Sequence, residues 1–234
     1  MKPVKPEYPM RINKYLAMRK YATRREADEI ISKRRVTING RLAVLGDKVK
    51  ENDVVEVKWN PKKYRYFAYN KPRGIITHSP QGEEQEIKEI MPIVGVFPVG
   101  RLDKDSHGLI ILTDDGRLTD SLLNPKFAHE KEYKVMTKDQ LPGYFKRKME
   151  EGVDIGGYVT RPCAVEMLSD RKFTITLTEG KKHQIRRMCG AFGQSAVDLE
   201  RKRIMNIKLG NLNPGEHRPI EGSELAQFLK SLGF

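Results

Sequence analysis

Cysteine is nearly absent from the sequence, which contains only Cys163 and Cys189 among 234 residues. The two lie far apart and outside any C-x-x-C pair, which argues against a disulfide framework and against a structural zinc site. Long apolar runs are also absent, and none approaches the ~20 residues that a membrane-spanning helix requires. The first residues lack the apolar core of a secretory signal. We therefore expect a cytoplasmic protein with no membrane partner and no bound metal ion.

Acidic residues are the minority among the charged ones. The chain has 44 Lys and Arg against 31 Asp and Glu, which gives a net charge of +13 at pH 7. Residues 1–64 hold 17 basic and 8 acidic residues, whereas the remaining 170 residues hold 27 and 23. A small N-terminal region thus carries most of the excess, which favours nucleic acid as a partner. A solubilising basic face is the alternative.

The N-terminal region combines two helical patterns with a hairpin. Residues 1–9 contain three prolines and little apolar material, and we predict a flexible leader there. Thr23 and Glu26 fit a capping box that would start the second helix. Asn39 and Gly40 fit the tight turn of a hairpin. Residues 10–57 are therefore predicted to fold as one small unit.

Three segments carry this helix–helix–hairpin order: RINKYLA at 11–17, TRREADEII at 23–31 and VTINGRLA at 36–43. Together they resemble the S4 RNA-binding domain, of αL type, over residues 10–57. The resemblance implies that basic side chains on both helices bind phosphate, helped by free backbone amides in the first turn of the second helix. A small packing module with a solvated cationic rim is the alternative. The candidate RNA contacts are Arg11, Lys14, Arg24, Arg25, Arg34 and Arg35.

The rest of the chain has the pattern of a second, larger domain. Residues 58–64 are polar and break the preceding pattern, so we predict a linker there and a domain over residues 65–234. Strands are expected at 66–70, 109–112, 132–135, 173–177 and 204–209 and helices at 118–123 and 184–192. Ser223 is predicted to cap a last helix. Because strands and helices do not alternate as β-α-β units, we expect an α+β fold with a mixed, mainly antiparallel sheet.

One acidic residue of this domain lies between basic neighbours. In GRLDKDSHGL at 100–109, Asp103 stands between Arg101 and Lys104 and is followed by an apolar run. A carboxylate held in a turn beside cations stays ionised and can act as a nucleophile. The alternative is a set of metal-binding carboxylates, formed by Asp103 and the other aspartates between residues 103 and 115. The basic neighbours disfavour it, because they would repel a divalent ion.

The segment GRLDKDSHGL, with NKPRG at 70–74 and KKHQIRRM at 181–188, resembles the pseudouridine synthases that modify ribosomal RNA at a single site. HEKEY at 129–133, QIRRMC at 184–189 and LERKRIMN at 199–206 resemble the F-type enzymes of the large subunit. The resemblance implies a monomeric enzyme that isomerises uridine to pseudouridine in 23S rRNA without a cofactor. Small-subunit rRNA or tRNA as substrate, a non-catalytic ribosome-assembly factor, and a metal-dependent nuclease are the alternatives.

The resemblance assigns three catalytic residues. Asp103 corresponds to the essential aspartate, Tyr133 to the aromatic residue that stacks on the base, and Arg186 to the basic residue beside the catalytic carboxylate. We therefore predict a direct charge-assisted pair between Arg186 and Asp103, because an arginine fixes a carboxylate better than a lysine does. From the residues alone, the alternation with apolar neighbours favours a core position for Tyr133. Binding of phosphate only is the alternative for Arg186 and Arg187.

The resemblance also points to residues that hold the RNA. Arg101 corresponds to the arginine that helps to hold RNA with the target nucleotide flipped out, and Ile185 to an apolar contact in the pocket. Arg187 and Lys71, the lysine of NKPRG, are further candidate RNA contacts.

Overall fold

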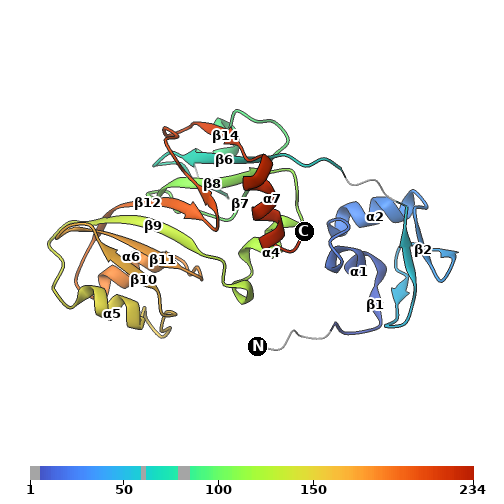
Figure 1. Ribbon diagram of the computed structural model, residues 1–234, viewed down its shortest axis with the longest axis horizontal. Helices are drawn as coiled ribbons and strands as arrows, with labels where there is room; N and C mark the ends of the chain where they lie inside the picture. The colour runs from blue at the N-terminus through green and yellow to red at the C-terminus, as the bar shows by residue number, and fades with distance from the viewer. Residues whose placement is uncertain (1–5, 59–61, 79–84) are drawn as a thin grey trace. The chain divides into compact units, whose positions relative to one another are not determined.

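The computed structural model describes residues 6–58, 62–78 and 85–234. The chain divides into two compact units, Met1–Lys63 and Tyr64–Phe234 (Figure 1). Most of the predicted leader and part of the predicted linker, residues 1–5 and 59–61, lie outside the described residues. No helix among the described residues is long and apolar enough to cross a membrane.

The smaller unit packs two helices against short antiparallel strands. Strands β3, β2 and β5 form one sheet in that order, and β1 pairs with β4. The predicted capping box is present, because Thr23 Oγ1 accepts from the Glu26 amide at 3.2 Å and Glu26 Oε2 accepts from the Thr23 amide at 2.8 Å. Tyr8, within the predicted leader, packs against the core of this unit. The elements are β1 (Met10–Arg11), α1 (Ile12–Met18), α2 (Arg24–Ser32), β2 (Val36–Ile38), β3 (Arg41–Leu42), β4 (Lys48–Val49) and β5 (Val55–Val57).

The larger unit is built on a sheet of nine strands among its described residues. The strand order is β10-β11-β9-β12-β8-β6-β14, with β13 beside β12 and β7 beside β8. All pairs are antiparallel except β12 with β8. The predicted α+β fold with a mixed, mainly antiparallel sheet is therefore confirmed. The strands are β6 (Tyr66–Lys71), β7 (Phe97–Val99), β8 (His107–Thr113), β9 (Lys131–Thr137), β10 (Ala164–Met167), β11 (Lys172–Leu177), β12 (Ala196–Ile204), β13 (Ile207–Lys208) and β14 (His217–Pro219).

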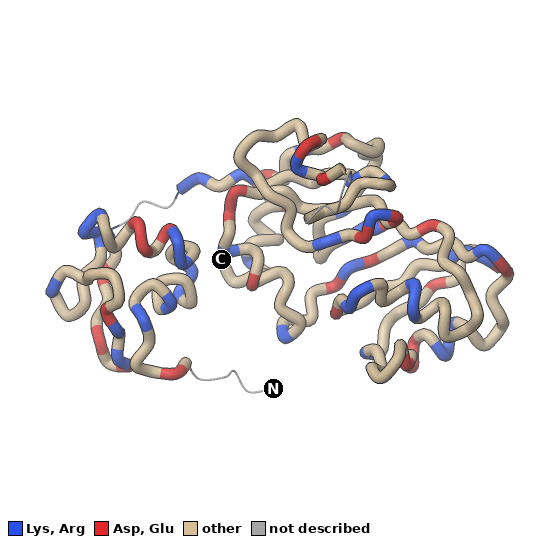
Figure 2. Tube along the Cα trace, turned by 180° about the vertical axis from the view of Figure 1, so that it is seen from behind, with Lys and Arg blue, Asp and Glu red and all other residues tan. Residues whose placement is uncertain are grey.

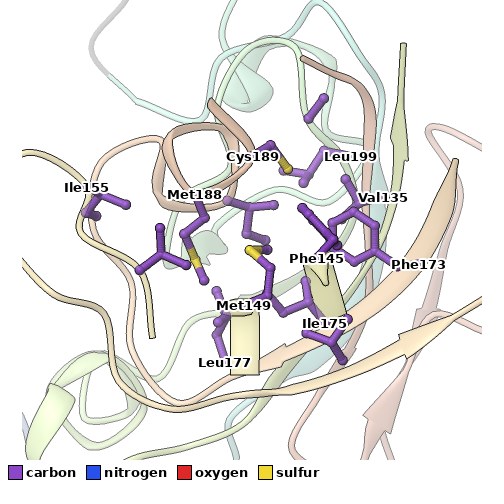
Figure 3. Packing of buried hydrophobic residues seen from close by; sticks show 14 residues of the cluster. Val135, Phe145, Met149, Ile155, Phe173, Ile175, Leu177, Met188, Cys189 and Leu199 are labelled. Atoms are coloured by element: carbon purple, nitrogen blue, oxygen red, sulfur yellow. The ribbon is translucent and has the colours of Figure 1, made fainter. Parts of the chain in front are cut away.

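Three hydrophobic clusters fill the larger unit, and the two largest join helices to the sheet. In the first, Phe145 and Met149 from α5 and Met188 from α6 pack on Phe173 and Ile175 of β11 (Figure 3). In the second, α4 and α7 pack on β6 and β8. The sheet thus joins two halves, each with its own helices (Figure 1). The helices of this unit are α3 (Ile87–Ile90), α4 (Leu118–Leu123), the 3₁₀ turn η1 (Pro125–Phe127), α5 (Phe145–Glu151), α6 (Gln184–Gly190) and α7 (Gly222–Ser231).

The parallel pair β12–β8 joins the two halves, and it depends on a glycine. Gly108 pairs with Arg201 and has a φ of +101°. A Cβ at this position would lie 2.5 Å from the carbonyl oxygen of Arg201, closer than any side chain allows. Only glycine permits both this backbone conformation and this approach of the two strands. The turn that carries Asp103 leads directly into this junction.

Two local predictions for this unit are wrong. The segment 204–209 is not one strand, because β12 ends at Ile204 and Met205, with a φ of 51°, begins a turn into β13. Ser223 does not cap the last helix, since α7 begins at Gly222 and its N-cap residue, Glu221, makes no side-chain cap. Turn residues with positive φ and the exact first residue of a helix are set by packing, which periodicity does not reveal.

Candidate active site

A pocket of about 550 Å³ opens beside the junction of β8 and β12. Its walls come from the turn that follows β7, the end of α4, the start of β9, the loop between β11 and α6, and the second half of β12. Segments far apart in the sequence thus meet around one cavity. Its lining includes five residues singled out in the sequence: Arg101, Asp103, Tyr133, Ile185 and Arg186.

The turn that carries Asp103 is fixed by backbone hydrogen bonds. The Ser106 amide donates to the Asp103 carbonyl oxygen at 3.0 Å. The Leu102 amide donates to Thr77 Oγ1 at 3.1 Å, and the same hydroxyl donates to the Leu102 carbonyl oxygen at 2.9 Å. The Asp103 side chain remains 38 % exposed. A carboxylate is therefore held in a defined place while a substrate can still reach it.

The side chain beside the Asp103 carboxylate is His183 and not Arg186. His183 Nε2 lies 3.5 Å from Asp103 Oδ1. Arg186 instead donates from Nη1 to the Ala196 carbonyl oxygen at 2.5 Å and from Nη2 to the Asp105 carbonyl oxygen at 3.1 Å. Within the described residues no hydrogen bond or ion pair joins Arg186 to Asp103, so the predicted direct pair is corrected. A motif indicates which segments meet, whereas the atoms that pair depend on the side-chain rotamers.

Arg186 nevertheless acts on the same turn. Its guanidinium links the Asp105 carbonyl oxygen, two residues after Asp103, to the start of β12. Such a fork of two donors needs the planar geometry of arginine. Arg186 therefore holds the backbone that carries the carboxylate.

Tyr133 and Ile185 form the apolar side of the pocket. Tyr133 lies in β9, half-buried, opposite Ile175 of β11 and Arg201 of β12. Ile185 is 5 % exposed and belongs to the first hydrophobic core. Each residue thus lines the pocket and also packs in the core, so the packing interpretation of Tyr133 is confirmed and its functional role stays a prediction. Arg101 is exposed at the edge of the same pocket.

Lys71 and Arg187 do not lie in the pocket. Lys71 is fully buried, and its ammonium group donates to the carbonyl oxygens of Pro72 and Ile75. Burial and the charge of Arg201 lower the pKa of Lys71 to about 8. Lys71 therefore supports the NKPRG turn and is not placed to contact RNA, which corrects its predicted role. Arg187 is exposed on α6, outside the pocket.

The aspartates considered as metal ligands are divided between two ends of β8. Asp114 Oδ2 lies 3.3 Å from Arg65 Nε, and Asp115 Oδ1 lies 2.8 Å from Arg117 Nε, after the last residue of the strand. Asp103 precedes the first residue of β8. The carboxylates thus do not converge on one ion, and the described residues contain no group of three or more potential metal ligands.

The predicted RNA contacts of the smaller unit are exposed. Lys and Arg recur along α1, α2 and the turn that follows (Figure 2). Arg24 and Arg25 are the first two residues of α2, where backbone amides are free of helical partners. All six predicted contacts of this unit are exposed, namely Arg11, Lys14, Arg24, Arg25, Arg34 and Arg35.

Sequence reasoning missed several polar residues of the pocket, among them His183, Lys131 and Arg201. His183 precedes α6 with a φ of 53°, so its backbone turns it toward Asp103 in a way that the sequence does not reveal. Lys131 and Arg201 stand in HEKEY and LERKR, where neighbouring Glu and Lys residues hide which side chain points inward.

Comparison with known protein families identifies the family to which the chain belongs. The family profile of the RNA pseudouridylate synthases matches residues 65–191, and that of the S4 domain matches residues 10–55. The chain belongs to the RNA pseudouridylate synthase family. The resemblance seen in the three sequence motifs is thereby confirmed. The enzyme isomerises uridine to pseudouridine in RNA.

Relatives match over nearly the whole chain. The dual-specificity RNA pseudouridine synthase RluF of Escherichia coli K12 is 41 % identical over 96 % of this chain and 80 % of its own length. The ribosomal small subunit pseudouridine synthase A of Pasteurella multocida is 32 % identical over 94 % of this chain and all of its own. A crystal structure of a pseudouridylate synthase superposes with a TM-score of 0.68 and 28 % identity, over 95 % of this chain and 99 % of that one.

Proposed function

We propose that the enzyme modifies uridine in large-subunit (23S) ribosomal RNA, with Asp103 as the group that attacks C1′ of the target nucleotide. The position of Asp103 carries the proposal, because its carboxylate is fixed and exposed at a pocket that also contains Tyr133, Arg101 and Arg186. Identity to the dual-specificity enzyme RluF, at 41 %, exceeds the 32 % to the small-subunit enzyme, which disfavours small-subunit rRNA. The motifs HEKEY, QIRRMC and LERKRIMN, which resemble those of the F-type large-subunit enzymes, favour 23S rRNA.

The reaction must break the bond between C1′ and N1, turn the base and join C1′ to C5. In the first step an Asp103 oxygen bonds to C1′ and N1 leaves with the electron pair. The base then turns, C5 attacks C1′, and the carboxylate leaves. A proton is lost from C5 and one is gained at N1, so the reaction is an isomerisation without a redox or energy requirement. A carboxylate activated by position suits such covalent catalysis.

Access to C1′ requires the nucleotide to leave the RNA stack, at a cost of a few kcal/mol. A pocket of about 550 Å³ is large enough to receive a base. Tyr133 offers a face on which the base stacks, and Ile185 provides an apolar contact beside it. Arg101, exposed at the edge, holds the backbone of the flipped nucleotide.

The smaller unit supplies RNA affinity in this proposal. Its exposed cations on α1 and α2 neutralise phosphates, which strengthens binding without reading the sequence. We propose further that the enzyme works as a monomer in the cytoplasm, where its ribosomal RNA substrate is made.

The substrate is tested by mapping pseudouridine with carbodiimide and primer extension. Total RNA from cells with and without the gene is compared, and the purified enzyme is then added to transcripts of 23S rRNA, 16S rRNA and tRNA. We expect one carbodiimide stop in 23S rRNA to disappear without the gene and to be restored by the enzyme. A stop that disappears only from 16S rRNA or only from tRNA would assign the other substrate. The tRNA arm matters because the RluF relative is named dual-specificity. If no stop disappears from any RNA, a non-catalytic assembly factor is the better description.

A further inference from the structure

Among the basic side chains of the pocket that have no part in the steps above, Lys131 and Arg201 lie on adjacent strands. Lys131 is the first residue of β9, and Arg201 lies in β12, where its backbone pairs with Tyr133. Both line the pocket with Asp103, and Arg201 is only 3 % exposed. We call Lys131 and Arg201 the cationic floor. Burying a charge costs free energy unless the charge is paired. The hydrogen-bond and ion-pair partners of these two side chains therefore show whether their charge is compensated within the protein.

Neither residue of the cationic floor is neutralised within the part of the chain that the structure describes. Arg201 donates from Nε to the Leu109 carbonyl oxygen at 2.6 Å and from Nη1 to the Arg101 carbonyl oxygen at 3.2 Å. Its Nη2 is buried and has no hydrogen-bond partner there. The Lys131 ammonium makes one hydrogen bond, to the His129 carbonyl oxygen at 3.3 Å. Two neighbouring cations thus have carbonyl groups and no carboxylate as partners.

The two carboxylates that line the pocket are engaged elsewhere. Asp103 lies beside His183. Glu179 accepts from the Tyr158 hydroxyl at 2.6 Å and from Gln184 Nε2 at 2.9 Å. The remaining ionisable groups around the pocket, besides Tyr133, are cations or histidines: Arg101, His129, Lys181, Lys182, His183 and Arg186. No carboxylate among the described residues therefore forms an ion pair with Lys131 or Arg201.

Ser106 provides a second buried polar atom of the pocket that has no hydrogen-bond partner among the described residues. Ser106 is fully buried, and its Oγ makes no hydrogen bond within the described residues. Ser106, like Arg201, lines the pocket. Buried polar atoms are normally satisfied, and unsatisfied ones in a pocket indicate a ligand that completes them. The ligand must bring oxygen atoms that accept hydrogen bonds and must tolerate or carry negative charge.

A nucleotide could bring oxygen atoms to the cationic floor either through its phosphate or through its base. The position of the floor inside the pocket favours the base. Phosphates belong to a continuous RNA backbone and stay at the edge, where Arg101, Lys181 and Lys182 are exposed. A flipped uracil enters the pocket and brings two carbonyl oxygens. When the bond from C1′ to N1 breaks, the electron pair remains on the base, and its negative charge spreads onto those oxygens. The base, unlike the phosphate, thus needs a cation most at the difficult step.

We propose that Lys131 and Arg201 bind the carbonyl oxygens of the target uracil and stabilise the negative charge of the base while it is detached from the sugar. The proposal deepens the proposed function and rests on it. Interactions that are stronger in the transition state than in the bound substrate accelerate the reaction more than they tighten binding. The cationic floor should therefore affect the chemical step more than RNA affinity.

Single-turnover kinetics on rRNA transcripts tests this division. Lys131→Met should lower the rate constant by about 10²-fold, as loss of one charge-stabilising donor does elsewhere, with little change in the Kd for RNA. Lys134→Met is the matched control, because Lys134 lies on the same strand with an exposed side chain. Lys131→Arg should keep most of the activity, since it keeps the charge.

The pH profile of kcat/KM gives a readout that a structural role would not change. Burial and the charge of Arg201 lower the pKa of Lys131 to about 8. The protonated form is the active one, so wild-type kcat/KM should fall as the pH rises through about 8. Lys131→Arg should move this fall to higher pH, because a guanidinium stays protonated. An unchanged profile in Lys131→Arg would contradict the proposal.

A substrate with a better leaving group provides the second readout. Fluorine at C5 withdraws electrons and lowers the cost of negative charge on the base. The loss caused by Lys131→Met should therefore be smaller on RNA that carries 5-fluorouridine at the target site, measured as consumption of that nucleotide after digestion. Equal losses on both substrates would show that Lys131 acts only through structure.

The remaining outcomes separate this proposal from the proposed function. If the wild-type enzyme converts no uridine in any of the three RNAs, both fail. If it is active while Lys131→Met has the wild-type rate and profile, the cationic floor alone is refuted. Arg201→Met also removes two hydrogen bonds to backbone, so it is interpreted only where its thermal unfolding matches wild type. The Lys131 variants decide the proposal whether or not Arg201→Met can be interpreted.

Discussion

The ammonium group of Lys71 is fully buried and held by two backbone carbonyl oxygens. A lysine in this setting costs stability in its charged form, and the pKa of Lys71 is lowered to about 8 by burial and by Arg201. In the sequence, Lys71 stands in NKPRG among residues that resemble RNA contacts. Nothing in the spacing of the motif shows that its side chain turns inward beneath the turn.

This burial predicts a pH-dependent stability. Between pH 8 and about 10.5 the unfolded state holds a proton on Lys71 that the folded state has lost, so the free energy of unfolding should rise with pH. Relative to Lys71→Met, the wild type should gain up to about 3 kcal/mol across this window. Urea unfolding of both proteins at pH 7.5 and pH 10 measures the difference. A difference that stays constant would show that Lys71 is not charged and buried at neutral pH.

Arg186 should act through the backbone of the catalytic turn. Its two hydrogen bonds, to the Asp105 and Ala196 carbonyl oxygens, require a planar fork. Arg186→Lys keeps the charge but offers a single nitrogen in place of two separate planar donors, so it cannot reproduce the spacing of these two hydrogen bonds. We expect kcat to fall about 10-fold because Asp103 is less well positioned. Arg147→Lys on the exposed face of α5 is the control. Full activity in Arg186→Lys would contradict a role for the fork.

At the scale of elements, the helix α5 shows what packing contributes beyond pattern. Residues 145–151 have no clear capping signal, and sequence reasoning did not predict a helix there. Phe145 is nevertheless fully buried, with its ring centroid 5.1 Å from that of Phe173 and 5.2 Å from that of Phe192. The helix is stabilised by this aromatic cluster, of which Figure 3 shows Phe145 and Phe173.

Removal of an aromatic ring from this cluster should therefore lower the stability of the larger unit. Phe145→Ala is expected to lower the free energy of unfolding by ~3–5 kcal/mol, because the cavity that it leaves cannot be filled. Tyr144→Ala, at an exposed neighbour, should cost less than about 1 kcal/mol. Denaturant unfolding measures both. Equal losses would mean that Phe145 does not anchor the core.

Helices and strands with a clear sequence pattern could be predicted. Those whose bounds depend on contacts with distant segments could not. The capping box of α2, the apolar run of β8 and the alternation of β9 and β11 are all visible in the sequence. The length of β12 and its parallel contact with β8 depend on distant residues, above all on the close approach at Gly108. The motifs showed which segments form the pocket, because they identify stretches of sequence. They did not show the His183–Asp103 contact, because contacts between individual atoms depend on how the folded segments pack.

At the scale of the whole molecule, charge is divided between the two units of the chain. Residues 1–64 carry 17 basic and 8 acidic residues, and the cations of α1 and α2 are exposed. Binding through phosphates releases counterions, so affinity should fall steeply with salt. The larger unit, with 27 basic and 23 acidic residues in 65–234, should contribute less to that dependence.

Replacing two exposed arginines tests this division in the full chain. Arg24→Gln with Arg25→Gln should weaken RNA binding and reduce the slope of log K against log salt by ~1.4–1.8, about 0.7–0.9 for each phosphate that is no longer neutralised. Lys146→Gln with Arg147→Gln on α5 is the control and should leave the slope unchanged. Filter binding at several salt concentrations gives both slopes. The opposite ranking would place the main RNA contacts on the larger unit.

The chemical role of Asp103 is tested most directly by release of tritium from RNA labelled at C5 of uridine. Asp103→Asn keeps the size of the side chain and removes its charge. We predict that the variant releases tritium at least ~10³-fold more slowly than the wild type in single turnover, while its Kd for the same RNA is unchanged. Release at nearly the wild-type rate by a folded Asp103→Asn protein would show that this carboxylate is not the attacking group.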